Sequence, residues 1–228
     1  NNNAAATQIN IGYSSTDTVA PTIALTSNVT SLHSGQTATV TFTLSEAATD
    51  FDINDIVVTG GTLSNFTGSG TSYTATFTPD ASSTADGTIR VDSSRFTDAA
   101  GNANTDGTDS NNALTFSIDT AIPVAPTLSL ATDSGSSNTD KLTNVGTLSL
   151  SGVETDAVVE YSINGIDWTS SFTPVEGTNT VYVRQTDLAG NVSAPSAAFT
   201  FVRDTTNPNN ATGLLSVAER SANGTIVG

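Results

Sequence analysis

Two short motifs with acidic side chains recur along the chain and mark places where oxygen-ligand chemistry could occur. The first, Asp-Thr-x-x-Pro, begins at Asp17, at Asp119 and at Asp204. The second, Asp-x-Ala-Gly-Asn, occupies residues 98–102 and 187–191. Carboxylate and amide oxygens are the ligands that calcium prefers. The motifs therefore predict divalent-cation binding, while the solubility of an acidic chain stays open as an alternative.

The charge composition agrees with either interpretation and excludes several function classes. The 228 residues include 22 acidic and 6 basic ones, which gives a formal net charge of −16. Only five of the acids are glutamates; the rest are aspartates, whose short side chains turn loops or hold cations. Six basic residues are too few to neutralise a nucleic-acid backbone. Without cysteine the chain has no disulfide, thiolate zinc site or cysteine nucleophile.

The remaining reactive side chains give little support for catalysis. His33 is the only histidine, and no Gly-x-Ser-x-Gly elbow accompanies it. Trp168, the only tryptophan, follows an Asn-Gly turn, which favours a core or sheet-edge position over sugar stacking. Residues 50–55 start like an EF-hand but lack its glycine at position six and its glutamate at position twelve. The sequence predicts a protein that is not an enzyme.

The segments between the motifs alternate apolar and polar residues with a period of two, which is typical of strands with one buried face. Turn clusters such as Gly60-Gly61 separate them, and no apolar run approaches the ~20 residues that cross a bilayer. Many short strands with regular turns predict antiparallel β-sandwiches, in which two sheets face each other. The alternating apolar positions are Val40, Phe42, Leu44, Tyr73, Ala75, Phe77, Leu114, Phe116, Ile118, Leu128, Leu130, Leu148, Leu150, Val159, Tyr161, Ile163, Val181, Val183, Phe199 and Phe201.

The order of the motifs divides the chain into domains. We expect one sandwich over residues 17–119 and a shorter one over residues 120–204. Residues 1–16 are expected to be the last strand of a preceding domain or a linker. Residues 205–228 are expected to begin a third, incomplete unit.

Linker and loop motifs in this order resemble the bacterial immunoglobulin-like repeats of large RTX-type, type I-secreted adhesins, over residues 17–206. Within the tail, Ser216-Val217-Ala218-Glu219 and residues 224–228 are similar to the opening of a cadherin-like repeat. The resemblance implies an all-β fold of tandem immunoglobulin-like Greek-key sandwiches arranged end to end. It also implies calcium between domains and an extracellular location at the bacterial cell surface, but not catalysis.

The resemblance further implies where calcium would bind, because the chain entry, the loop after the second strand and the loop before the last strand share one pole of such a sandwich. Crowded carboxylates repel each other unless a cation joins them. Asp50 is an additional candidate in the first domain, and Asp156 is an alternative to Glu154 in the second. The implied calcium ligands are Asp17, Glu46, Asp98 and Asn102 in the first domain, Asp119, Glu154, Asp187 and Asn191 in the second, and Asp140 and Asp204 at the opposite pole.

These observations together predict a structural extender of a bacterial cell-surface adhesin. Its immunoglobulin-like domains would be rigidified by calcium at the interdomain linkers and would support cell adhesion and biofilm formation. Two alternatives stay open: a glycan- or protein-binding module of the adhesin, and an accessory domain of a secreted polysaccharide hydrolase. The expected partners are neighbouring immunoglobulin-like or cadherin-like domains of the same chain, in a monomer that neither binds nucleic acid nor inserts into membranes.

Overall fold

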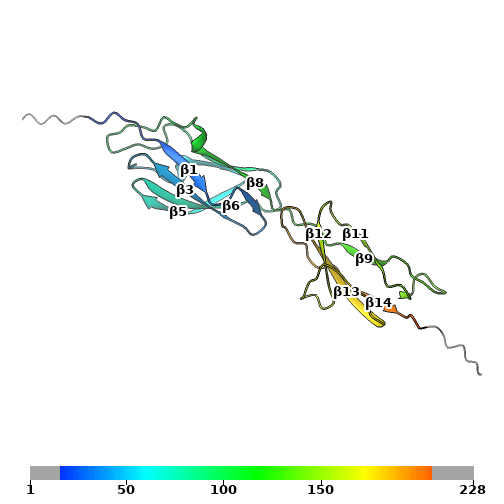
Figure 1. The fold of residues 1–228 in the computed structure, drawn as a ribbon. Helices are drawn as coiled ribbons and strands as arrows, with labels where there is room; N and C mark the ends of the chain where they lie inside the picture. Colours follow the sequence, from blue (N-terminus) through cyan, green and yellow to red (C-terminus); the bar gives the residue numbers. More distant parts are fainter. Residues whose placement is uncertain (1–15, 207–228) are drawn as a thin grey trace, which may run out of the picture. The chain divides into compact units, whose positions relative to one another are not determined.

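The computed structural model describes residues 16–206, which form two compact units (Figure 1). Unit 1 holds residues 16–126, 152–159 and 184–195, and unit 2 holds residues 127–151, 160–183 and 196–206. The predictions for residues 1–16 and 205–228 lie outside the described residues, apart from residues 16, 205 and 206.

Unit 1 contains a β-sandwich, here called the first sandwich, made of two four-stranded sheets. All its strand pairs are antiparallel except β2 with β8, which is parallel. One sheet has the order β1-β3-β6-β5, with β1 (Ile23–Ser27), β3 (Ala38–Leu44), β6 (Ser72–Pro79) and β5 (Gly61–Ser69). The other has the order β2-β8-β7-β4, with β2 (Ser31–His33), β8 (Ala113–Asp119), β7 (Gly87–Val91) and β4 (Ile56–Thr59).

The alternating pattern of β3 shows why these segments form strands. Val40 and Phe42 are fully buried, while the threonines between and beside them lie at the surface or are half-buried. Threonine and aromatic residues favour such a pleated, half-buried surface. Phe77 of β6 is also fully buried and stacks on Phe116 of β8, with ring centroids 4.8 Å apart. The two sheets thus enclose one aromatic-rich core.

Unit 2 is built on two smaller sheets. The four-stranded sheet has the order β10-β14-β13-β12, with β10 (Leu142–Thr143), β14 (Phe199–Arg203), β13 (Gly177–Thr186) and β12 (Val158–Ser162). The ends of β12 and β13 extend into unit 1. The second sheet pairs only β11 (Leu148–Ser151) with β9 (Thr127–Leu130).

The prediction of an all-β protein built of immunoglobulin-like β-sandwiches is confirmed. Two short 3₁₀ helices, η1 (Ile53–Asp55) and η2 (Ser110–Asn112), interrupt the loops of unit 1. One detail of the predicted pattern is wrong: Ile163 follows the end of β12 and is 71% exposed, because the chain turns there at Asn164. Within residues 16–206, no helix has the length and apolarity to span a bilayer.

Candidate functional site

Three carboxylates from distant parts of the sequence lie together in unit 1. Asp17 precedes β1, Glu46 follows β3, and Asp98 lies in the connection between β7 and β8. One carboxylate oxygen of each residue lies within 4.8 Å of the other two. Asp17 is exposed, Glu46 is half-buried and Asp98 is buried. We call these three residues the carboxylate cluster; its oxygens are close enough to share one cation.

Hydrogen bonds within its loop fix the carboxylate of Asp98. Oδ1 of Asp98 accepts the backbone N–H groups of Ala100 and Asn102, each at 2.8 Å. Oδ2 accepts Nδ2 of Asn102, also at 2.8 Å, and the same Nδ2 donates to the backbone oxygen of Asp17 at 3.2 Å. Gly101 adopts a φ of 89°, which a side chain would strain. The Asp-x-Ala-Gly-Asn motif therefore presents its aspartate and ties the loop to the linker.

Backbone contacts join the loop that carries Glu46 to the start of the first sandwich near Thr22 and to the loop of Asp98. Next to Glu46, Ser45 donates its backbone N–H to the oxygen of Thr22 at 2.9 Å. In return, the backbone N–H of Thr22 donates to Oγ of Ser45 at 2.9 Å. On the other side of Glu46, Ala48 forms an antiparallel bridge with Asp98. These backbone contacts therefore place Glu46 beside the linker and beside Asp98.

The electrostatics of the carboxylate cluster are unfavourable without a counter-ion. Burial raises the pKa of Glu46, and the charges of Asp17 and Asp98 raise that pKa further. The side-chain hydrogen bond from Asn102 lowers the pKa of Asp98, against the opposing effect of burial. Asp98 is thus held in its charged form beside a carboxyl group whose ionisation it opposes. A bound cation would reverse this effect, since it favours the ionised form of every carboxylate around it.

In the second copy of the motif in unit 1, the aspartate again accepts hydrogen bonds from its own loop. Oδ1 of Asp187 accepts the backbone N–H groups of Gly190 and Asn191, each at 2.8 Å, and Oδ2 accepts Nδ2 of Asn191 at 2.8 Å. The same Nδ2 donates to the backbone oxygen of Asp119 at 2.9 Å. Burial would raise the pKa of Asp187, but the hydrogen bonds from Asn191 and the backbone lower it overall. Asn191 therefore ties the linker at Asp119 to the loop aspartate Asp187.

Glu154 does not join a second group of acids. Within residues 16–206, the carboxylate cluster is the only group of three or more His, Cys, Asp or Glu side chains placed to hold a metal. The backbone N–H of Glu154 donates at 2.8 Å to Oε1 of Gln185, which is fully buried. Nε2 of Gln185 donates to the backbone oxygens of Val124 at 2.6 Å and Gly152 at 2.9 Å. The uncharged amide of Gln185 thus hydrogen-bonds the backbone around Glu154. Calcium binding by Glu154 stays a prediction.

Asp140 and Asp204, in unit 2, each stabilise a local turn. Oδ1 of Asp140 accepts the backbone N–H of Leu142 at 3.1 Å. Oδ1 of Asp204 accepts the backbone N–H of Thr206 at 2.9 Å, and hydrogen bonds from the Thr206 side chain and backbone lower the pKa of Asp204. These bonds leave other carboxylate oxygens available, so the role of both residues as calcium ligands stays a prediction.

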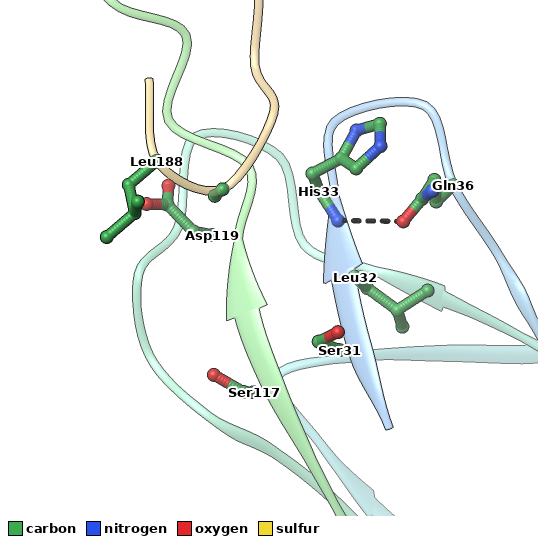
Figure 2. Close-up of a pocket in the computed structure, with 8 residues that line it drawn as sticks. Ser31, Leu32, His33, Gln36, Ser117, Asp119 and Leu188 are labelled. Carbon is green, nitrogen blue, oxygen red and sulfur yellow. Dashed lines mark hydrogen bonds between the residues drawn. The ribbon is translucent and has the colours of Figure 1, made fainter. Parts of the chain in front are cut away.

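A hollow of about 410 Å³ lies beside His33 in unit 1, and Figure 2 shows the side chains around it. Nδ1 of His33 lies 3.0 Å from the backbone oxygen of Ser34, and its backbone N–H donates to Oε1 of Gln36 at 3.2 Å. The backbone N–H of Ser34 donates to Oδ1 of Asn191 at 2.7 Å. The histidine is held by backbone and amide groups and not by the carboxylate and hydroxyl of a catalytic triad. That the protein is not an enzyme stays a prediction.

Sequence reasoning missed three buried polar residues that shape unit 1. Asp106 is 8% exposed, and its Oδ2 accepts the backbone N–H of Ile23, the first residue of β1, at 2.6 Å. Fully buried Asn104 donates Nδ2 to Oδ1 of Asp106 at 3.3 Å. These two loop residues follow no periodic pattern. Gln185 could have been found, because it continues the inward-facing positions of β13.

Comparisons with known proteins find a family model that is similar to the first sandwich. Residues 17–115 match the family model described as a bacterial Ig-like domain. No curated protein matches the chain. Among solved structures, the chain is similar to the adhesin InvE of Yersinia pseudotuberculosis, at 17% sequence identity and a TM-score of 0.32. That alignment covers 78% of this chain and 58% of the length of the InvE structure. The family match supports a bacterial Ig-like domain in the part of the chain that contains the carboxylate cluster.

Proposed function

We propose that the carboxylate cluster binds a calcium ion, and that the chain is a structural segment of a bacterial cell-surface adhesin. The observation that carries the proposal is the meeting of Asp17, Glu46 and Asp98 from three separate segments. One ion bound to all three would join the linker before β1 to two loops of the first sandwich. The linker would then be a fixed part of the sandwich rather than a free hinge.

Calcium fits the cluster better than other metals. It accepts about six to eight oxygen ligands in irregular arrangements, and backbone oxygens and water can complete its shell. Magnesium demands a stricter octahedron, and the common transition metals favour nitrogen or sulfur ligands. The cluster offers carboxylate oxygens from Asp17, Glu46 and Asp98, and the amide of Asn102 lies hydrogen-bonded beside them. These ligands are the hard oxygen donors that calcium selects.

The position of the motifs supports the mechanical role. Each linker aspartate stands between segments that are predicted to be separate domains, and Asp17 and Asp119 are each hydrogen-bonded to the asparagine of a loop motif. In this proposal, calcium rigidifies a row of immunoglobulin-like domains outside the cell, and the row supports cell adhesion and biofilm formation. The match of residues 17–115 to a bacterial Ig-like domain supports this role.

Calcium titration of the full chain by calorimetry tests the binding step. We expect saturable binding that Asp98→Asn weakens strongly, while Asp86→Asn, which removes the same charge from an exposed residue outside the cluster, leaves it unchanged. Small-angle scattering with and without EDTA tests the mechanical step, which predicts a narrower distribution of interdomain distances in calcium. Equal binding by both variants would refute the assigned site, and identical scattering profiles would refute the rigidifying role.

A further inference from the structure

Unit 2 closes its interior less completely than the first sandwich does. Its buried hydrophobic residues among those described are Val181, Val183 and Phe201. The leucines of β9 and β11 face the interior but are only half-buried, in contrast to the fully buried Val40 and Phe42 of β3. Apolar surface at these positions is therefore accessible from outside unit 2.

A missing strand explains this exposure. In the first sandwich, β3 has a partner on each side, β1 and β6. Among the described residues of unit 2, β11 pairs only with β9. Residues 170–176, which follow β12 and its bridge to Thr169, form no strand. The side chain of Asn179 holds this segment, since its Oδ1 accepts the backbone N–H of Val175 and its Nδ2 donates to the oxygen of the same residue, both at 2.8 Å. A fixed, irregular segment thus replaces a strand.

Two adjoining hollows lie along this segment. One, of about 420 Å³, runs between it and the start of β11 at Leu148. The other, of about 280 Å³, lies against the turn that contains Asn164. Tyr161, Ser171 and Phe172 line both hollows, so two aromatic side chains stand in the wall that the hollows share. Together they form a continuous, partly aromatic surface in a chain with only 6% aromatic residues.

We propose that these two hollows bind a neutral carbohydrate, with Tyr161 and Phe172 as its stacking platforms. A sugar ring presents an apolar face of C–H groups and an edge of hydroxyl groups, so it needs aromatic surface beside small polar groups. Both occur here, because the residues that line the hollows include serines and threonines as well as the two aromatic residues. No lysine or arginine is among the described residues that line them, and Asp167 stands at one rim. The side chain of Arg203 lies beside Gly146 and Pro174, but the formal net charge of −16 disfavours anionic ligands.

The walls of the site are held in place before any ligand arrives. Oδ1 of Asn164 accepts the backbone N–H groups of Ile166 and Asp167, each at 2.9 Å, and its Nδ2 donates to Oδ2 of Asp167 at 2.8 Å. The hydroxyl group of Thr169 donates to the backbone oxygen of Ser171 at 2.8 Å. Such preorganisation lowers the entropy lost on binding. The site is built from unit 2 alone and does not depend on the proposed calcium function.

Sugar titrations of the full chain in EDTA test the proposal. The probes are glucose, galactose, N-acetylglucosamine and β-linked glucose oligomers. Saturation-transfer NMR and the fluorescence of Trp168 detect their binding; Trp168 is the residue between Asp167 and Thr169 in the sequence, and both of these line a hollow. We expect at least one probe to bind. Phe172→Leu keeps an apolar side chain but removes the ring, and should weaken binding roughly tenfold. Ser171→Phe should block both hollows, while Ser149→Phe, at an exposed serine that lines neither, should bind normally.

Three outcomes would overturn the proposal. The first is the absence of binding by every sugar probe. The second is equal sugar affinity of Phe172→Leu and the wild type, which would point to a general apolar contact rather than to stacking on the ring. The third is equal binding by Ser171→Phe and Ser149→Phe, which would place the sugar elsewhere. Unchanged calcium titration of the folded variants separates this test from that of the carboxylate cluster.

Discussion

Calcium should stabilise the first sandwich by mass action, because the three ligands of the carboxylate cluster meet only after folding. Extracellular calcium modules have dissociation constants of about 10⁻⁴–10⁻³ M, so about 10 mM calcium would add roughly 1.4–2.7 kcal/mol to the free energy of unfolding. For a sandwich of about 100 residues this corresponds to a rise in melting temperature of roughly 6–20 °C. Magnesium at the same concentration should give a smaller rise.

The variant Glu46→Gln separates the electrostatic cost of the cluster from its cation affinity. The pKa of Glu46 is raised in the folded state, so its ionisation destabilises the fold as the pH rises through that pKa. At pH 7 in EDTA, Glu46→Gln should therefore melt at a temperature equal to or above that of the wild type. In calcium the order should reverse, because the variant has lost one charged ligand.

Differential scanning calorimetry of the full chain measures both effects, and hydrogen exchange by mass spectrometry assigns them to peptides of the first sandwich. Asp86→Asn serves as the control, since it changes the net charge by the same amount at an exposed residue outside the cluster. An equal calcium-induced rise in Glu46→Gln and in the wild type would refute the reasoning. So would a rise confined to peptides from unit 2.

Three further predictions concern the first sandwich. Phe77→Ala should cost about 3–5 kcal/mol of unfolding free energy in urea titrations, whereas Thr78→Ala, at an exposed position on the same strand, should cost less than about 0.5 kcal/mol. Asn104→Leu should lower the free energy of unfolding by about 2–4 kcal/mol, because it leaves several backbone groups unpaired. Asn112→Leu should leave the free energy of unfolding nearly unchanged. Neither polar atom of the buried Asn112 side chain has a hydrogen-bond partner among the described residues. The pKa of Asp98 is lowered on folding, so in EDTA the stabilising effect of this ionised carboxylate should be lost below about pH 4. Asp98→Asn should therefore reduce the fall in melting temperature between neutral pH and pH below 4. An equal fall in the variant and the wild type would contradict this.

Much of the fold was predictable because its causes are local. The alternation of β3 and β6 identifies both the strands and the buried face, since side chains alternate sides along any strand. The same rule predicted that Ile163 is buried, but β12 ends one residue earlier, at Ser162, because the chain turns at Asn164. Residues 170–176 contain Pro174, which has no N–H to donate to a sheet, but the sequence does not show which strand lacks a partner as a result, because strand pairing depends on segments far away in the sequence.

The candidate site divides in the same way. Residue types and motif spacing determined that aspartates, with neighbouring asparagines, would carry any cation chemistry, and that each loop motif would build the same turn around its aspartate. Only the tertiary structure decided that Glu46 joins its cluster while Glu154 does not join a second one. The physical reason is long-range: a buried Gln185 side chain holds the Glu154 backbone, whereas Ser45 and Ala48 bring Glu46 to the linker and to Asp98.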